Sequence, residues 1–138
     1  MTLLQVESLC KAFGGVRALD GPSFGVAAGE LVALIGPNGA GKSTCFNIIN
    51  GQLRPDRGRV LLDGRNVAGR APRDLFRLGV GRTFQITQTF GSMSVRENLQ
   101  VALSSAAREH FHWWQRARGR HEAEAEAMLD AVGMATQA

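Results

Sequence analysis

The residues from 36 to 44, GPNGAGKST, combine glycines with a lysine and two hydroxyl side chains at a spacing suited to phosphate binding. Gly36, Gly41, Lys42 and Ser43 fit the pattern G-x-x-x-x-G-K-[ST], the P-loop of nucleotide-binding proteins. Glycines in such a loop let backbone N–H groups approach the phosphates with no Cβ in the way. Lys42 would place its charge on the β- and γ-phosphates, and the Ser43 hydroxyl would ligate Mg²⁺. We therefore predict a binding site for a nucleoside triphosphate and its magnesium ion.

A P-loop needs a strand that leads into it and a helix that follows it, and the sequence indicates both. The stretch 24–36 suggests strands, and its last part, ELVALIG, is a continuous apolar run ended by glycine, typical of a strand buried on both faces. The stretch KSTCFNIING (42–51) predicts a helix whose N-terminus, with free N–H groups and the positive end of its dipole, turns toward the anion. This context favours a nucleotide site over a glycine-rich turn that matches by chance.

The rest of the chain is expected to place its strands first and its helices later. Asp63-Gly64 predicts a hairpin turn between two strand pieces within 58–67. Ser94 and Glu97 match a capping box, which opens an apolar-periodic helix. Further strands are expected at 3–9 and 79–85, and further helices at 72–80 and 122–132.

Composition limits the kind of protein without selecting its ligand. A chain of 138 residues, 44% hydrophobic and 20% charged, suits one modest globular domain. It has no apolar run near the ~20 residues of a membrane span and no signal-peptide pattern, so the cytoplasm is the expected compartment. The net charge of +4 is compatible with phosphate ligands, acidic lipid or nucleic acid. Cys10 and Cys45 have no metal or redox spacing, and we expect reduced, buried thiols.

The flanks of the P-loop carry a family resemblance. The stretch from VESLCKAFGG to LLDGRNV (6–67) resembles the ATP-binding subunit of ABC transporters, and LGVGRTFQITQTFGSMSVRENLQVAL (78–103) is similar to the branched-chain amino acid importer group. The resemblance is close over about residues 3–105. It implies an α/β P-loop NTPase fold of the ABC ATPase type, with an N-terminal antiparallel β part and a following helical part, incomplete relative to the family. Residues 1–90 would form the nucleotide-binding core, and residues 91–138 the start of the helical subdomain.

The resemblance also implies roles for individual residues. Phe13 would stack on the adenine ring, the alternative being a phenylalanine of the core. Gln85 matches the Q-loop glutamine, which would reach Mg²⁺ or the attacking water and sense the membrane partner; without its RTFQ context it would be an ordinary surface glutamine. Lys42 and Gln85 are thus the candidate catalytic residues, and Ser43 and Gln85 the candidate magnesium ligands. The phosphate-wrapping residues implied by the family, besides Gly36, are Asn38, Gly39, Ala40, Gly41, Lys42, Ser43 and Thr44.

Several family motifs are not found in these 138 residues: the LSGGQ-type signature, the Walker B aspartate with its catalytic glutamate, and the switch histidine. Asp63 in RVLLDG follows apolar residues, as the Walker B aspartate does in the family. However, Gly64 stands where the glutamate should follow, and Asp63-Gly64 predicts a turn. His110, His112 and His121 are expected at the surface. Because phosphoryl transfer depends on positioning and charge neutralisation, the 138-residue chain is expected to bind ATP and to have negligible ATPase activity alone.

The resemblance implies a subunit that binds ATP and Mg²⁺ to energise an ABC importer, for branched-chain amino acids or similar polar solutes. It would pair with a second ATP-binding subunit, the same or different, under membrane permease subunits, peripheral at the cytoplasmic face of the membrane. Alternatives are a soluble ABC-type ATPase acting on nucleic acid and a truncated nucleotide-binding remnant without transport activity. The stretch HFHWWQRARGR (110–120) suits a solvated helix, or less well a lipid or permease contact; no nucleic-acid motif accompanies it, and no nucleic-acid partner is expected.

Overall fold

The structure is a computed structural model that describes residues 2–84, 89–107 and 121–134. The chain forms two compact units, residues 1–83 and 84–138. No helix within the described ranges is long and apolar enough to cross a membrane.

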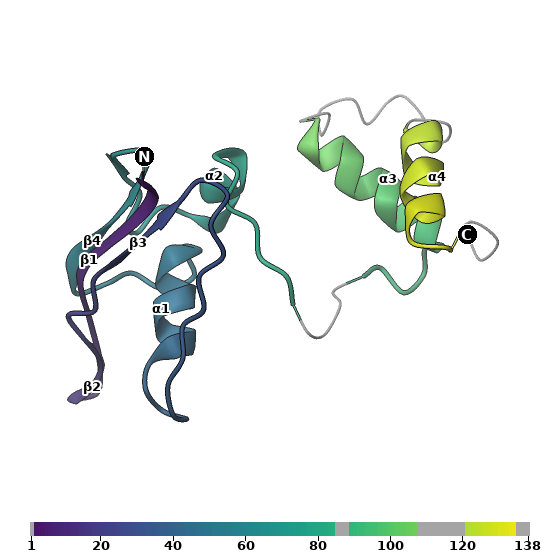
Figure 1. The fold of residues 1–138 in the computed structure, drawn as a ribbon. Coiled ribbons are helices and arrows are strands. Elements are labelled where there is room, and N and C mark those ends of the chain that lie inside the picture. The colour runs from purple at the N-terminus through teal and green to yellow at the C-terminus, as the bar shows by residue number, and fades with distance from the viewer. Residues whose placement is uncertain (1, 85–88, 108–120, 135–138) are drawn as a thin grey trace. The chain divides into compact units, whose positions relative to one another are not determined.

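The first unit is built on an antiparallel sheet with the order β2-β1-β4-β5, and β3 also pairs with β1 (Figure 1). Strand β1 forms its centre: the residues near its end pair with β2, those near its start pair with β3, and its other edge pairs with β4. The strands are β1 (Thr2–Phe13), β2 (Val16–Asp20), β3 (Phe24–Ala27), β4 (Arg57–Leu62) and β5 (Arg65–Asn66). The predicted strand at 3–9 and the predicted antiparallel β part are confirmed.

The predicted hairpin within 58–67 is also confirmed. Leu62 pairs with Arg65 across a two-residue turn at Asp63 and Gly64, whose φ angles are 47° and 73°. Two successive positive φ angles are typical of the type I′ turn that matches the twist of the strands it joins. Asp63 therefore belongs to a turn, as predicted, rather than to the end of a buried strand.

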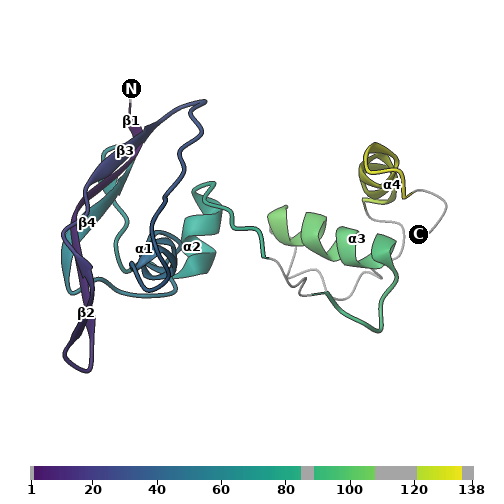
Figure 2. The same ribbon diagram turned by 60° about the horizontal axis from the view of Figure 1, so that its bottom comes forward.

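Two helices, α1 (Lys42–Ile49) and α2 (Pro72–Arg77), cover one face of this sheet (Figures 1 and 2). The core lies between these helices and the sheet, and in it Cys45 and Ile48 of α1 and Leu75 of α2 are each 1% exposed. The core also contains Val6, Leu9, Leu19, Val60 and Val67. Helix α2 begins at Pro72, which suits a first helical position because its missing N–H would be unpaired there. The core thus anchors α1 against β1 and β4.

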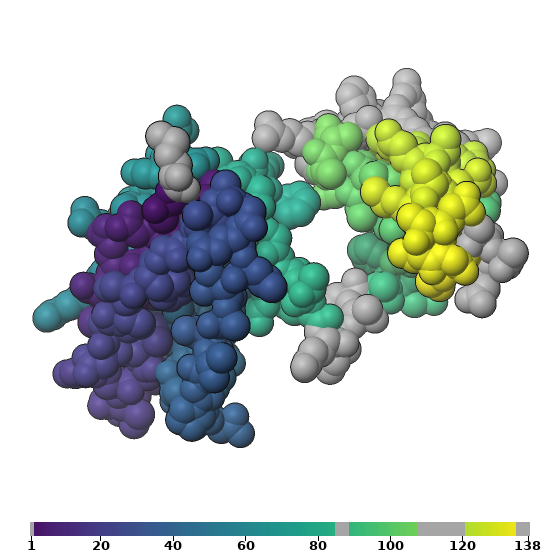
Figure 3. Space-filling model, in the orientation of Figure 1, coloured from purple at the N-terminus to yellow at the C-terminus, as the bar shows by residue number. Residues whose placement is uncertain are grey.

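The predicted buried strand at 30–36 is wrong for this structure. Residues 28–41 lie on the surface of the first unit, the indigo-to-blue band in Figure 3, and Leu31 and Ile35 are 98% and 90% exposed. A strand buried on both faces needs neighbouring strands, and within the described ranges no strand pairs with this segment. Residues 31–35 are apolar, as the prediction assumed, but a strand forms only where another strand, distant in the sequence, lies beside them.

The predicted strand at 79–85 is likewise not formed over its described residues, 79–84. The segment is held by other bonds. The backbone N–H of Val80 donates to the Leu75 carbonyl (3.0 Å), and the Arg82 guanidinium donates to the side chains of Asn47 (2.6 Å) and Gln52 (2.9 Å). These bonds tie the segment to α2 and to the end of α1 instead of to a sheet edge.

The second unit contains α3 (Val95–Ala106) and α4 (Glu122–Ala131), which confirm the helices predicted there. Ser94 is the N-cap of α3: its hydroxyl accepts from the Glu97 N–H (3.2 Å), and the Glu97 carboxylate accepts from the Ser94 N–H (2.8 Å). The predicted capping box is confirmed. An ion pair links the two helices: the Arg96 guanidinium Nη2 lies 3.6 Å from the Glu126 carboxylate Oε1.

Candidate functional site

The loop before α1 and the first turn of that helix form the candidate phosphate site. Gly41 is the N-cap of α1, with φ 81° and ψ 6°, and no side chain caps the helix. The first turn also contains no acidic residue. Uncapped N–H groups at a helix N-terminus, together with the positive end of the helix dipole, favour an anion. The predicted helix start is confirmed, and its chemistry fits a phosphate group.

Gly41 is required by two independent features of its surroundings. Its φ angle lies in the left-handed region, which side chains with a Cβ rarely adopt. A Cβ at this position would lie 2.1 Å from the Ala18 carbonyl oxygen and 2.9 Å from Leu19 Cδ2. The loop therefore packs directly on the backbone of β2, and this contact fixes where the helix N-terminus lies relative to the sheet.

Lys42 folds back over the loop. Its ammonium group donates to the carbonyl oxygens of Gly36 and Pro37, the latter at 2.7 Å. The ammonium has three donors, and these bonds hold it beside the exposed loop residues Asn38, Gly39 and Ala40. The Ala40 N–H donates to the Pro37 carbonyl (3.2 Å), which completes a tight turn. A phosphate oxygen would compete with the two carbonyls for the same ammonium.

The predicted hydroxyl residues lie in the first turn of α1. Ser43 is exposed and Thr44 is half-buried. The exposed hydroxyl of Ser43 has the chemistry of a magnesium ligand. Within the described ranges, no group of three or more His, Cys, Asp or Glu side chains could hold a metal ion. Gln85, the other predicted magnesium ligand and catalytic residue, lies outside the described residues.

Phe13 lies at the end of β1, where the hairpin to β2 turns through Gly14 and Gly15. Its side chain is 46% exposed and does not belong to the core, so the alternative of a core phenylalanine is wrong. The Lys11 ammonium lies over its ring, 5.5 Å from the centroid. Because Gly41 touches β2, the hairpin that carries Phe13 borders the phosphate loop.

The Cys45 thiol lies in the core of the first unit. It is 1% exposed, and burial raises its pKa above the ordinary value of 9.0, so the thiol stays protonated. Cys10 is half-buried, and both cysteines are free, as predicted. The expectation that both are fully buried holds for Cys45 only.

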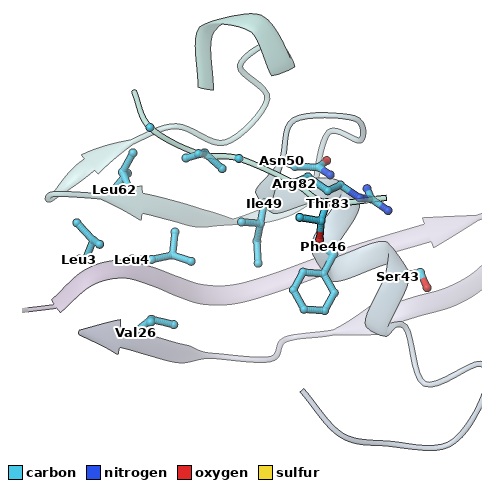
Figure 4. Close-up of a pocket in the computed structure, with 13 residues that line it drawn as sticks. Leu3, Leu4, Val26, Ser43, Phe46, Ile49, Asn50, Leu62, Arg82 and Thr83 are labelled. Carbon is cyan, nitrogen blue, oxygen red and sulfur yellow. The ribbon is translucent and has the colours of Figure 1, made fainter. Parts of the chain in front are cut away.

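An apolar cavity of about 620 Å³, which the sequence did not predict, lies between α1, the sheet and residues 79–83 (Figure 4). Its walls include Leu3, Leu4, Val26, Phe46, Ile49 and Leu62. Ser43 is part of both the cavity lining and the phosphate loop. Phe46 and Ile49, three positions apart in the sequence, lie on one side of α1 and both line the cavity. Of the phosphate-loop residues 36–44, only Ser43 lines this cavity, so the cavity is not the phosphate site.

Comparison with known proteins supports one family. A family model described as ABC transporter matches residues 19–138. Over 112 residues the chain is 40% identical to the probable branched-chain amino acid transport ATP-binding protein LivG of Archaeoglobus fulgidus, covering 81% of this chain and 44% of the relative. Over 106 residues it is 42% identical to the ribose import ATP-binding protein RbsA of Ruegeria sp., covering 77% of this chain and 21% of the relative.

Among solved structures, the ADP conformation of MJ1267, an ATP-binding cassette of an ABC transporter, is similar with a TM-score of 0.79 and 33% identity. The similarity covers 99% of this chain and 56% of that one. The chain thus spans about half the length of the relatives it matches, or less. The loop geometry, the family model and the shared fold agree, and the chain belongs to the ABC transporter family, where it matches part of the ATPase domain.

Proposed function

We propose that residues 36–44 bind ATP with Mg²⁺, and that the chain serves as part of the ATP-binding subunit of an ABC importer. The observation that carries the proposal is the uncapped N-terminus of α1, placed by Gly41 and bordered by the Lys42 ammonium. The solved relative MJ1267 is described in its ADP conformation, which supports a nucleotide ligand for the same fold.

In the proposed complex, Lys42 exchanges its carbonyl partners for phosphate oxygens. The N–H groups of the first helical turn donate to the same phosphates, and the loop backbone from Asn38 to Gly41 wraps around them. The Ser43 hydroxyl ligates Mg²⁺, which neutralises phosphate charge when bound. Gln85 is proposed as a second contact to Mg²⁺ or the attacking water.

Calorimetry with ATP and Mg²⁺ tests the phosphate site. Lys42→Ala removes a charged donor, and a hydrogen bond to a charged group contributes about 1.5–3 kcal/mol, so we expect affinity to fall by about tenfold or more. Arg73→Ala is the matched control, because it removes the same charge from an exposed position in α2. Equal ATP affinity for wild type and Lys42→Ala would contradict the site.

Phe13 is proposed as the platform for adenine. Its ring is exposed at the end of a hairpin that borders the phosphate loop, where a flat apolar face suits a base. Loss of a base–aromatic stack in nucleic-acid sites costs about 1–3 kcal/mol, so Phe13→Ala should weaken ATP binding by roughly tenfold. Binding of inorganic tripolyphosphate, which has no base, should stay unchanged.

The proposed partners are membrane permease subunits and a second ATP-binding subunit, with the chain peripheral at the cytoplasmic face of the membrane. The LivG relative supports import of branched-chain amino acids, while the RbsA relative, named for ribose import, is equally similar to this part of the chain. Residues 36–44 therefore support ATP as the ligand, and the solute proposal rests on the relatives named for branched-chain amino acid transport.

Cysteine crosslinking in membranes of cells that co-express the permease tests the partner. The proposed docking surface runs from residue 86 to 103, and Phe90 and Met93 are exposed within its described part. Cysteines at these two positions, in a Cys10→Ser background, should crosslink to the permease. A cysteine at Val16, which is 71% exposed in the β1–β2 hairpin, is the control. Crosslinks from position 16 alone would contradict the proposed surface.

A further inference from the structure

The Asp56 carboxylate links the end of β1 to the segment that precedes β4. Its Oδ1 accepts from the Lys11 ammonium (2.7 Å), and its Oδ2 accepts from the Ala12 N–H (2.8 Å). The Asp56 N–H in turn donates to the Cys10 carbonyl (2.9 Å). Three bonds from one residue therefore hold three successive residues of β1, immediately before Phe13.

These bonds extend the contacts of β1 on the edge that pairs with β4. That pairing ends at Cys10 and Arg57, so the backbone groups that follow on this edge of β1 have no ladder partner from β4. Backbone groups beyond the end of a ladder need other partners. Asp56 supplies an acceptor for the Ala12 N–H at this point. The local backbone course into Phe13 thus depends on a residue 44 positions away.

The same carboxylate also holds the positively charged Lys11 ammonium over the Phe13 ring. The Lys11 side chain is only 17% exposed, and its ammonium is held by Asp56 over the ring, 5.5 Å from the centroid. Cations prefer the face of an aromatic ring, and at this distance they are attracted to it. Lys11 therefore covers one face of Phe13, and a planar base that stacks on the ring must use the other face.

We propose that Asp56 is a positioning residue for the adenine platform: it holds Lys11 against one face of Phe13 and fixes the backbone that carries the ring. This inference rests on the proposed function, in which Phe13 stacks on adenine. Asp56 itself makes no contact with the nucleotide. Its effect on ATP binding is exerted entirely through Phe13.

The test compares two ligands, ATP and inorganic tripolyphosphate, both with Mg²⁺, by calorimetry on the 138-residue chain. Asp56→Asn removes the charge that holds Lys11, and we expect ATP affinity to fall about threefold, a fraction of the roughly tenfold loss expected when the whole base stack is removed. Tripolyphosphate affinity should stay at the wild-type value. Asp20→Asn, which breaks the exposed Arg17–Asp20 pair in the same hairpin, is the matched control and should alter neither.

A double-mutant cycle with Phe13→Ala separates positioning from general destabilisation. If Asp56 acts through Phe13, Asp56→Asn should cause no further loss of ATP affinity once the ring is removed. A further loss in that background, or an equal loss for tripolyphosphate, would overturn the proposal. Lys11→Met is the second variant, because it keeps the Asp56 bond to the Ala12 N–H and should still lower ATP affinity selectively.

Failure of the inference can be distinguished from failure of the adenine site. If Phe13→Ala binds ATP like wild type, Phe13 is not the platform and the proposed adenine contact fails. If Phe13→Ala loses affinity while Asp56→Asn and Lys11→Met bind ATP like wild type, the platform stands and the positioning role of Asp56 is overturned. Thermal unfolding of each variant shows that the comparison is made on folded protein.

Discussion

Substitution of Gly41 by alanine tests the physical basis of the phosphate loop. The left-handed backbone, φ 81°, costs about 1–2 kcal/mol for a residue with a Cβ. In addition, the new Cβ would lie 2.1 Å from the Ala18 carbonyl oxygen, so the loop or β2 has to move. Overpacking of this kind typically costs about 1–3 kcal/mol. We therefore expect Gly41→Ala to lower the free energy of unfolding by about 2–5 kcal/mol.

Gly39→Ala in the same loop is the matched control. Gly39 also has a positive φ, 86°, but a Cβ there would meet no atom within 4 Å. This variant should show only the backbone cost of about 1–2 kcal/mol. The difference between the two variants, about 1–3 kcal/mol, isolates the contact between the loop and β2.

Thermal and denaturant unfolding of the two variants measure this difference. For a unit of 83 residues, 1 kcal/mol corresponds to about 4–8 °C in the unfolding midpoint. Gly41→Ala should thus unfold at least about 4 °C below Gly39→Ala. If the two variants unfold at the same temperature, Gly41 does not pack against β2, and this contact does not place the N-terminus of α1.

Three further outcomes are expected. Asn98→Ala should speed hydrogen exchange at the Phe90 N–H, and exchange at the Ala107 N–H is the control. The Asn98 side chain accepts from the Phe90 N–H (2.8 Å) and donates to the carbonyls of Phe90, Met93 and Ser94. Unchanged exchange at the Phe90 N–H would contradict the role of these bonds. The hydrogen bond from Lys11, and then that from the Ala12 N–H, lowers the pKa of Asp56 below its ordinary value of 3.8. The contribution of ionised Asp56 to stability is therefore complete above pH 3.8 and is lost as the pH falls through the folded-state pKa. The difference in unfolding free energy between wild type and Asp56→Asn should shrink from pH 5 to pH 3. A difference that grows would contradict the lowered pKa. Finally, Cys10→Ser should react with a thiol reagent only on unfolding, because its remaining thiol, Cys45, is 1% exposed; rapid reaction of the native variant would contradict that burial.

Local signals in the sequence predicted the parts of the molecule that depend on local chemistry. The start of α1 at Lys42, the Asp63-Gly64 turn and the capping box of Ser94 and Glu97 all form where expected. Each depends on residues within a few positions of one another, through a special φ angle or a side chain that reaches its own backbone. The family resemblance, which also depends on short sequence motifs, was confirmed by the family model that matches residues 19–138.

Only the tertiary structure decided which segments pair and which distant side chains meet. The apolar run ELVALIG has the composition of a buried strand, yet Leu31 and Ile35 are exposed, because burial requires partner strands that local composition does not specify. The link from Asp56 through Lys11 to Phe13 spans more than 40 residues and has no sequence signature. Periodicity and motifs report what a segment can do by itself, whereas strand pairing and long-range hydrogen bonds depend on where the folded chain returns.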